Sequence, residues 1–384
     1  MMFRPLLGSL LIALTLLVGT LPAAAQLFET RAKQAYLVDA DTGTVLFAKN
    51  ENDQVPPASL AKLMTMEVVF NAIESGRLTL DDTFQVSENA WRTGGAASRT
   101  STMFAELKSS IRLEDLIRGV IVQSANDGCI IIAEGMAGSE DNFARLMTER
   151  AHAIGLTNSV FGNSTGLPHP DSKVTMKDLV TLARHIQTTY PQFYKYYSEP
   201  DFTWNKIKQR NRNPLLGLDI GVDGLKTGFT EESGYGIVSS IKRDGRRLFL
   251  AMSGMASLRE RAEEARKILE WGIRAFDRKQ LFEEGETIAE VGVYGGENPA
   301  IMKAKGPVDI LLPITYPDRL TARITYHWPL RAPLEAGAEI GVLKVYIGDT
   351  LSQETPLFAV NSVSKGTLHS QALDALLELA QFWR

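Results

Sequence analysis

Two side chains in this sequence have the types and the spacing needed for covalent chemistry: Ser59 and Lys62, three positions apart. A serine hydroxyl is a poor nucleophile until a neighbouring base takes its proton. On a helix, a spacing of three residues places both side chains on one face, and the unpaired N–H groups at a helix start favour developing negative charge. A lysine can be the base if burial or a nearby cation lowers its pKa. We therefore predict that Ser59 is a nucleophile and Lys62 its base.

A second candidate group consists of Ser124 and Asn126. They lie between two segments of helical periodicity, 113–122 and 128–137, so we expect them to project from a loop. There Ser124 could relay a proton toward a leaving amine, and Asn126 could hold Lys62 and a substrate amide in place. The alternative is that both side chains only cap the following helix.

The third candidate group, Lys226, Thr227 and Gly228, lies in a β-prone segment. A cation and a hydroxyl on one strand can bind a substrate carboxylate together, and a glycine leaves room for close backbone approach. Alone, such a sequence is more often the end of a surface strand. The functional prediction therefore depends on all three groups occurring together.

These three groups, in this order, resemble the motif set of class A β-lactamases and penicillin-binding proteins. More closely, the chain resembles the D-alanyl-D-alanine carboxypeptidases, which are low-molecular-mass penicillin-binding proteins. The resemblance runs over nearly the whole chain after its N-terminal leader and includes residues 161–163 (Phe-Gly-Asn) and 166–167 (Gly-Leu). Many members of this family carry histidine where this chain has Phe229. A role of the histidine side chain is therefore not expected at this position, whereas the backbone N–H of Phe229 can still have one.

The resemblance implies a role for each catalytic candidate. Ser59 would attack the carbonyl between two D-alanines and form an acyl-enzyme, with Lys62 as its general base. Ser124 would pass the proton to the departing D-alanine, and Asn126 would order the network. Peptidoglycan stem peptides are implied as substrates, and β-lactam antibiotics as covalent inhibitors.

The resemblance also implies how the substrate binds. Lys226 with Thr227 would hold the terminal carboxylate, and Lys226 would lower the pKa of Lys62 through like-charge repulsion. The backbone N–H groups of Ser59 and Phe229 would form an oxyanion hole, a contribution of about 3 kcal/mol for each donor in acyl transfer. The implied substrate-binding set is Lys226, Thr227, Gly228, Phe229, Arg212 and Arg261.

Two other kinds of function stay open on the sequence. A β-lactamase or a DD-endopeptidase could use the same scaffold, although the chain has no Glu-x-x-Leu-Asn sequence, with which class A β-lactamases activate the deacylating water. A non-catalytic cell-wall-binding scaffold protein is the other alternative. The presence of Ser59, Lys62, Ser124 and Lys226 argues against it, because a disused site tends to lose some of its residues.

The composition argues against some partners and cofactors. With 41 basic and 45 acidic residues the formal net charge is −4, which argues against nucleic acid, because phosphate binding requires concentrated Lys and Arg. The five histidines show no metal-ligand spacing, so we predict neither a metal nor a cofactor. The single cysteine, Cys129, lies in an apolar run and is predicted to be a small buried core residue.

The elements that must position these groups follow from periodicity and turn residues. A hairpin is predicted from 34–39 and 44–49. Helices are expected at 59–73, 113–122, 128–137, 140–154, 176–190 and 259–276, and strands at 236–241 and 247–253. This pattern predicts an α+β domain with an antiparallel sheet and helices, and the resemblance implies the β-lactamase/transpeptidase-like fold.

The N-terminal residues 1–25 are predicted to be a signal peptide. Arg4 precedes an apolar run at 6–18, and the alanines at 23–25 match a cleavage site before Gln26. An uncleaved N-terminal anchor is the alternative. The pattern predicts a protein exported across the cytoplasmic membrane.

The exported chain is predicted to have three parts. Residues 26–278 form the serine DD-peptidase catalytic domain, and residues 279–366, with short β-prone pieces, form a small β-rich domain. Residues 367–384 form an amphipathic helix whose apolar side carries Leu368, Ala372, Leu376, Leu379 and Trp383. This helix resembles the membrane anchor of the family, and packing on the β-rich domain is the alternative. We therefore expect peripheral binding to the periplasmic face of the cytoplasmic membrane.

Overall fold

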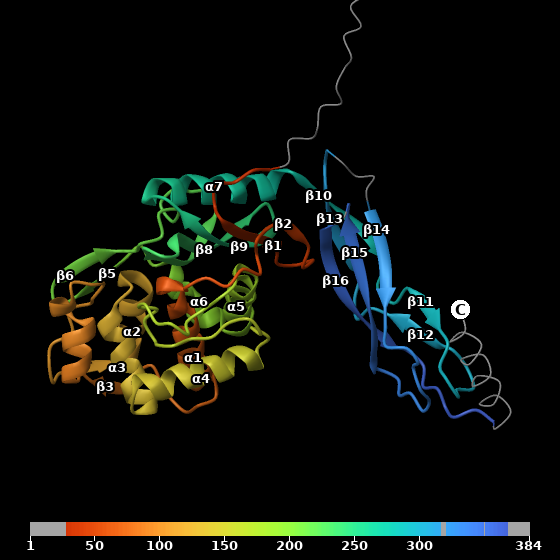
Figure 1. Ribbon diagram of the computed structural model, residues 1–384, viewed down its shortest axis with the longest axis horizontal. Helices are drawn as coiled ribbons and strands as arrows, with labels where there is room; N and C mark the ends of the chain where they lie inside the picture. Colours follow the sequence, from red (N-terminus) through yellow and green to blue (C-terminus); the bar gives the residue numbers. More distant parts are fainter. Residues whose placement is uncertain (1–27, 316–319, 349, 368–384) are drawn as a thin grey trace, which may run out of the picture.

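The computed structural model describes residues 28–315, 320–348 and 350–367 (Figure 1). The predicted signal peptide lies outside these residues, and so does the predicted C-terminal helix apart from Thr367. Within the described ranges, none of the helices has the length and the apolar character needed to cross a membrane. The described chain forms a larger unit of helices and sheet and a smaller unit of strands, which lie beside each other in Figure 1.

The centre of the larger unit is a five-stranded antiparallel sheet with the strand order β2-β1-β9-β8-β7. Its strands are β1 (Gln34–Asp39), β2 (Val45–Lys49), β7 (Val222–Thr230), β8 (Gly234–Arg243) and β9 (Arg246–Met255). The predicted N-terminal hairpin is confirmed, and so are the two predicted strands. Strand β1 pairs with β9, so the first strand of the unit lies beside its last. Strand β7, which carries the third candidate group, is at one edge of the sheet.

Helix α7 (Leu258–Arg274) covers one face of this sheet. Ser257 caps its start by accepting a hydrogen bond from the backbone N–H of Glu260. The apolar side of the helix and this face of the sheet share one buried core, which includes Leu248, Leu250, Ala265, Ile268 and Leu269. The helix ends before the predicted residue 276 because Phe276 already begins strand β10.

Helices cover the opposite face of the sheet and form a second core. They are α1 (Lys62–Glu74), α2 (Leu113–Arg118), α3 (Asn126–Ala137), α4 (Glu140–Ala153), α5 (Met176–Thr189) and α6 (Pro191–Tyr194). Two predicted helices are only partly α-helical. The helix expected from residue 59 begins as a 3-10 turn, Ala58–Ala61, and the one expected at 113–122 ends in a π-turn, Gly119–Gln123. Both of these irregular turns lead directly into candidate site residues.

Short strand pairs complete the larger unit. Strand β3 (Thr83–Gln85) pairs with β4 (Ser110–Arg112), and β5 (Asp201–Trp204) pairs with β6 (Ile207–Arg210). The hairpin of β5 and β6 lies at the end of the unit far from the smaller unit (Figure 1).

The smaller unit is built from strands, as predicted, around its own apolar core. Strand β10 (Phe276–Phe282) pairs with β13 (Val308–Pro313). A five-stranded sheet with the order β11-β12-β16-β15-β14 consists of β11 (Ala289–Val291), β12 (Ala300–Lys303), β14 (Leu320–Thr325), β15 (Glu339–Ile347) and β16 (Thr350–Ala359). The domain boundary expected at residue 279 falls inside β10.

Candidate active site

Ser59 lies in the 3-10 turn that precedes α1, with two glycines packed closely around that turn. A Cβ atom added at Gly166 would lie 1.7 Å from the carbonyl oxygen of Ala58, and one added at Gly228 would lie 3.2 Å from the backbone nitrogen of Ser59. Gly166 also has a φ of +75°, which favours glycine. The loop at residue 166 can therefore approach the Ser59 turn only because glycine occupies that position, and a side chain at Gly228 would press strand β7 away from the turn by a few tenths of an ångström.

The Lys62 amine lies at the first position of α1 and is almost completely buried. Its Nζ contacts Ser59 Oγ at 3.1 Å, Asn126 Oδ1 at 2.7 Å and the Thr165 carbonyl oxygen. A carbonyl oxygen and an amide oxygen can only accept hydrogen bonds. An uncharged amine would therefore direct its two hydrogens to Asn126 and Thr165 and leave its lone pair for the Ser59 hydroxyl.

Burial lowers the pKa of Lys62, because desolvation disfavours the charged ammonium. The nearby Arg212 cation also lowers this pKa, and the Glu140 carboxylate raises it. The Cys129 thiol has no compensating charge at neutral pH, because burial raises its pKa to about 12. The environment of Lys62 therefore favours the uncharged amine that a general base requires.

Asn126 is held so that its amide oxygen faces Lys62. Its Nδ2 donates to Thr100 Oγ1 at 2.9 Å, and its backbone N–H donates to the Ser101 carbonyl at 2.7 Å. The next residue, Asp127, accepts hydrogen bonds from the loop that contains Thr100 and Ser101. Asn126 is the first residue of α3 and does not project from a loop. The predicted helix start at residue 128 was therefore two residues too late.

Ser124 occupies the junction between the π-turn and α3, with a φ of +60°. Its buried hydroxyl accepts a hydrogen bond from Lys226 Nζ at 2.9 Å, and the same Nζ donates to the Thr227 carbonyl at 3.0 Å. Burial lowers the pKa of Lys226 well below its usual value, and repulsion from Lys62 lowers it further. The repulsion between the two lysines therefore acts on the pKa of Lys226, whereas burial and Arg212 lower the pKa of Lys62. That Lys226 lowers the pKa of Lys62 stays a prediction.

The turn at residues 163–166 was not assigned a role from sequence, yet it supplies the Thr165 carbonyl oxygen to Lys62. Asn163 Oδ1 closes the turn by accepting from the Thr165 N–H at 3.2 Å, the Thr165 hydroxyl at 2.9 Å and the Gly166 N–H at 2.7 Å. An asparagine that bonds to backbone N–H groups shortly after it, followed by glycine, is a recognisable turn signal. The signal could have located the turn but not its contact with Lys62.

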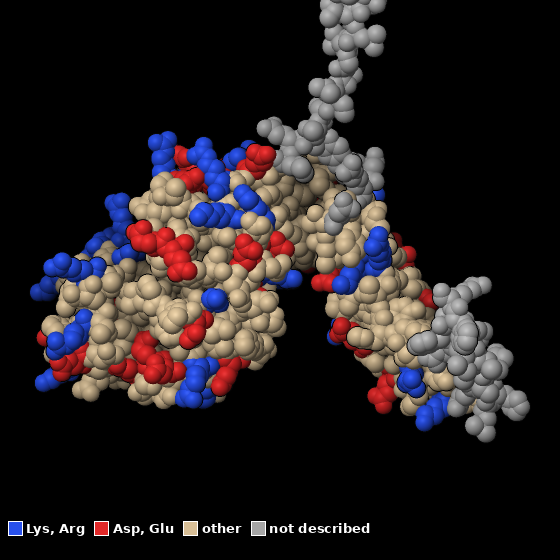
Figure 2. Space-filling model, viewed as in Figure 1, with Lys and Arg blue, Asp and Glu red and all other residues tan. Residues whose placement is uncertain are grey.

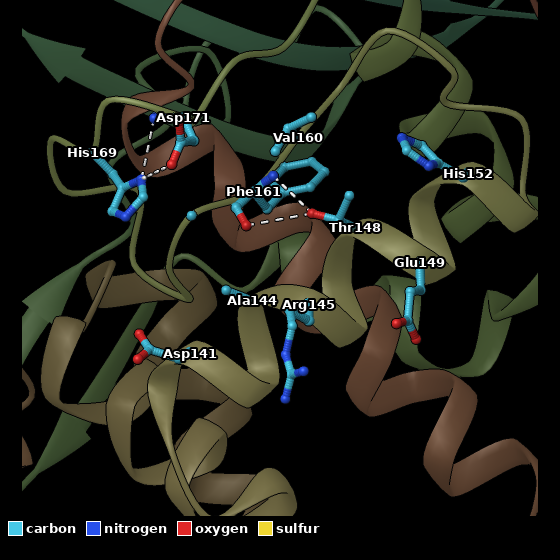
Figure 3. A pocket seen from close by; sticks show the side chains of 11 residues that line it. Asp141, Ala144, Arg145, Thr148, Glu149, His152, Val160, Phe161, His169 and Asp171 are labelled. Atoms are coloured by element: carbon cyan, nitrogen blue, oxygen red, sulfur yellow. Dashed lines mark hydrogen bonds and ion pairs between the residues drawn. The ribbon is translucent and has the colours of Figure 1, made fainter.

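Helix α4 holds the start of this turn in place. Glu140 accepts hydrogen bonds from the Ser164 hydroxyl at 2.5 Å and from the Ser164 N–H at 3.2 Å. A hollow of about 430 Å³ lies between α4 and residues 160–171 (Figure 3). There, Thr148 on α4 accepts from the Phe161 N–H at 3.0 Å. Neither Ser59 nor Lys62 lines this hollow, so it is not the candidate site.

On the other side of β7, Arg261 of α7 is a buried cation without a carboxylate partner among the described residues. Its side chain lies over the Tyr235 ring at 5.8 Å, and its Nε has no hydrogen-bond partner within the described ranges. Burial lowers the pKa of Arg261 to about 10. Phe229 is 44% exposed and stacks on Tyr235 with ring centroids 4.3 Å apart. An unpaired buried guanidinium beside an open edge of the site is suited to an anionic ligand.

Arg212 lies on the chain segment between β6 and β7 and is exposed to solvent. It lies close enough to Lys62 and Lys226 to lower the pKa of each. Solvent screens the charge of an exposed guanidinium, so we expect a modest effect. Arg212 is therefore placed at the rim of the site, whereas Lys226 and Arg261 are buried within it.

Cys129 is completely buried in the core beneath the site, as predicted. In the part of the chain that the structure describes, no three His, Cys, Asp or Glu side chains are grouped so that they could hold a metal ion.

The candidate residues form two hydrogen-bonded groups that meet in one place. The first contains Ser59, Lys62 and Asn126, and the second contains Ser124 and Lys226. The two groups are electrostatically coupled through their lysines. The arrangement brings two serine hydroxyls and two buried lysine amines together, with strand β7 against the Ser59 turn.

Comparison with known proteins gives matches to both units of the chain. A family model described as D-alanyl-D-alanine carboxypeptidase matches residues 21–256, and one described as penicillin-binding protein 5, C-terminal domain, matches residues 276–365. The D-alanyl-D-alanine carboxypeptidase DacD of Escherichia coli (strain K12) is 35% identical over 358 residues, which cover 92% of each chain. DacF of Bacillus subtilis (strain 168) is 29% identical over 376 residues, covering 94% of this chain and 95% of DacF.

Solved structures are similar over the same extent. The crystal structures of penicillin binding protein 5 from Haemophilus influenzae match with a TM-score of 0.74 and 34% identity, covering 88% of this chain and 98% of that chain. Penicillin binding protein 6B from Escherichia coli matches with a TM-score of 0.68, also at 34% identity. The expected fold, a transpeptidase-like α+β domain followed by a small β domain, is thus confirmed.

Proposed function

The chain belongs to the D-alanyl-D-alanine carboxypeptidase family and is a serine hydrolase of this kind, and we propose specific roles for its site residues. In this proposal Ser59 is the nucleophile, Lys62 is the general base, and peptidoglycan pentapeptides are the substrate. The observation that carries it is the contact of a buried amine, Lys62 Nζ, with the Ser59 hydroxyl at 3.1 Å.

In the proposed acylation step, Ser59 Oγ attacks the carbonyl carbon of the penultimate D-alanine, and the hydroxyl proton moves to Lys62 Nζ. The lowered pKa of Lys62 favours the uncharged amine that accepts this proton. Asn126 and Thr165 accept the two amine hydrogens, which directs the lone pair to Ser59. The backbone N–H groups of Ser59 and Phe229 stabilise the negative oxygen of the intermediate.

Collapse of the intermediate breaks the C–N bond, and the leaving amine of the terminal D-alanine takes a proton from Ser124. Lys226 already donates to Ser124 Oγ, so the Ser124 hydrogen is not used in that contact and can go to the amine. The ammonium of Lys62 then returns a proton to Ser124. In deacylation Lys62 takes a proton from the water that attacks the acyl-enzyme carbonyl carbon. As the bond from that carbon to Ser59 Oγ breaks, Lys62 returns this proton to Ser59 Oγ.

The terminal carboxylate of the substrate is bound, in this proposal, by Lys226, Thr227 and Arg261. The Nε of Arg261 has no hydrogen-bond partner among the described residues, which supports this assignment, because a buried guanidinium with an unpaired N–H gains from an anion. Arg212 supplies additional positive charge at the rim. Gly228 contributes space, since a side chain there would press against the Ser59 turn.

The proposal is tested by D-alanine release from a synthetic pentapeptide and by labelling with a fluorescent penicillin. We expect the wild-type protein to release D-alanine and to keep the label on a peptide that contains Ser59, and Ser59→Ala to lose both. Ser362→Ala is the matched control, because Ser362 and Lys365 repeat the Ser-x-x-Lys spacing in the smaller unit. Rapid turnover of the label would instead favour a β-lactamase, and labelling without D-alanine release a non-catalytic binding protein.

We also propose that the chain acts on the periplasmic face of the cytoplasmic membrane, held there by residues 367–384. The proposal is supported by the apolar run and alanines at the N-terminus and by the amphipathic pattern at the C-terminus. The polar side of the terminal segment carries Asp374 and Glu378, so attraction to anionic lipid is weak and apolar burial must supply the affinity.

A further inference from the structure

The hairpin of β5 and β6 presents a row of cations at alternate positions. Lys206, Lys208 and Arg210 follow one another at every second residue, and Arg212 continues the series. Lys208 and Arg210 lie on one face of β6, because alternate side chains of a strand do, and Lys206 lies in the turn that precedes the strand. We name the first three residues the basic face.

The opposite side of the hairpin attaches it to the larger unit. Gln209 Nε2 donates to the Thr102 carbonyl at 3.0 Å, and Asn211 Nδ2 donates to the Glu199 carbonyl at 3.0 Å. Phe202, which lies opposite Gln209 on β5, packs against the core. Because Gln209 and Asn211 are turned toward the domain, the basic face is turned away from it.

The charge of this hairpin contrasts with that of the whole chain. Residues 201–212 contain four basic residues and one acid, Asp201, whereas the chain has a net charge of −4. Asp201 pairs with Lys208 at 3.0 Å, and the Lys208 side chain nevertheless remains 65% exposed. Figure 2 shows Lys and Arg side chains gathered at this end of the larger unit.

The row of cations leads toward the candidate active site. The loop that receives Gln209 also holds Asn126, through Thr100 and Ser101. At the inner end of the row, Arg212 is close enough to lower the pKa of Lys62. A strip of exposed cations therefore extends from Arg212 at the rim of the site to Lys206 at the tip of the hairpin.

We propose that the basic face is an interaction surface for the carboxylate-rich part of a peptidoglycan peptide, outside its D-Ala-D-Ala end. Three exposed cations in a row attract a peptide with several carboxylates, and this attraction reaches about 10 Å at about 0.1 M ionic strength and further at lower salt. The strip leads such a peptide to the site where its end is cut. This inference rests on the proposed function and adds a second recognition surface to it.

The test compares wild-type protein with the variant Lys206→Gln/Lys208→Gln/Arg210→Gln. The control variant, Lys279→Gln/Lys303→Gln, removes cations from β10 and β12 of the smaller unit. One substrate is diacetyl-lysyl-D-alanyl-D-alanine, whose only carboxylate is the terminal one, and the other is a pentapeptide with additional glutamate and diaminopimelate carboxylates. Release of D-alanine is measured at 25 mM and 500 mM salt.

For the hairpin variant at low salt we expect KM for the acidic pentapeptide to rise about fivefold with kcat unchanged, because uniform binding is lost. The tripeptide is expected to show no change, and high salt should remove the difference between wild type and variant. An equal KM for the acidic substrate, or an equal loss on both substrates, would overturn the inference. So would a variant that loses binding to phosphatidylglycerol vesicles but keeps its KM, since that makes the surface a lipid site. Failure of the wild type to release D-alanine from either peptide would instead overturn the proposed function.

Discussion

The site contains two buried lysines, and burying a charged lysine is energetically costly. Lys62 and Lys226 are both nearly inaccessible to solvent and lie near each other, and burial lowers the pKa of each. Neither Nζ forms an ion pair with a carboxylate among the described residues; their hydrogen bonds go to hydroxyl, amide and carbonyl oxygens. This environment disfavours two ammonium ions at once.

The carboxylate of Glu140 provides a residue-scale test of Lys62 as the base. Its negative charge raises the pKa of Lys62, so Glu140→Gln is expected to lower that pKa further while the amide oxygen can still accept from Ser164. A base with a lower pKa is uncharged from a lower pH upward. The acidic limb of the pH profile of kcat/KM should therefore move to lower pH, measured by D-alanine release from pH 5 to 10.

Glu149→Gln is the matched control for this measurement, because Glu149 is an exposed carboxylate on the same helix α4. It should leave the acidic limb where it is in the wild type. A limb that moves to higher pH in Glu140→Gln, or that moves equally in both variants, would argue against Lys62 as the titrating base.

At the scale of elements, the site is formed where irregular turns meet. The 3-10 turn carries Ser59, the π-turn ends at Ser124, and the turn closed by Asn163 delivers the Thr165 carbonyl. Each of these turns is anchored by a regular element, α1, α3 or α4. The helices therefore hold the turns rigidly, and the turns place Ser59, Ser124 and the Thr165 carbonyl in the candidate site.

Gly166→Ala tests whether contact between turns is needed for the chemistry. The new Cβ would lie 1.7 Å from the Ala58 carbonyl oxygen, so the Ser59 turn or the 163–166 turn must shift. A displacement of about 1 Å can reduce the rate by about 100-fold. We therefore expect acylation by a fluorescent penicillin to slow by at least tenfold.

The control for this variant is Gly138→Ala, at the end of α3. Gly138 has a similar φ of +76°, but a Cβ added there would meet nothing within 4 Å. Both variants carry the backbone penalty of a left-handed alanine, about 1 kcal/mol, which thermal unfolding measures. If the two variants were acylated equally fast, close packing against Ala58 would not matter for the site.

At the scale of the whole molecule, the larger and smaller units are joined through the N-terminal hairpin. Thr44 Oγ1 accepts from the Leu311 N–H at 3.2 Å and donates to Gln353 Oε1 at 3.1 Å, and Leu46 shares a core with Leu311. Thr44 and Gln353 are buried. These contacts connect the sheet of the catalytic unit directly to β13 and β16, so the smaller unit is packed against it and is not merely tethered.

A chain that ends at residue 366 should keep D-alanine release and lose membrane association, because the described core is intact without the terminal segment. Cell fractionation measures the second effect. In the full chain, Leu376→Gln/Leu379→Gln should also release the protein, since it removes about two buried apolar side chains from the proposed membrane face. The polar-side pair Gln371→Ala/Gln381→Ala is the control and should stay bound. Unchanged membrane binding after truncation would refute the anchor.

Local chemistry explains how much of this site could be predicted from the sequence. Ser59 and Lys62 are neighbours along the chain, and a single turn of helix brings them together whatever surrounds it. Hairpins and helix periodicity are also local, so most elements were predicted within a few residues. The resemblance then connected three motifs that no local rule relates.

Only the tertiary structure decided which groups complete the network. The Thr165 carbonyl belongs to the backbone, so the residue type at position 165 does not reveal its contact with Lys62, which lies 103 residues away in the chain. The hydrogen bond between Asn126 and Thr100 could likewise not be predicted, because only the fold brings these two residues together. The pairing of Ser124 with Lys226 depends on how β7 lies against the helices. The position of α7 likewise leaves Arg261 Nε without a hydrogen-bond partner among the described residues. A sequence specifies its local conformations directly, whereas contacts between distant segments and the burial of each charge arise only when the whole core has packed.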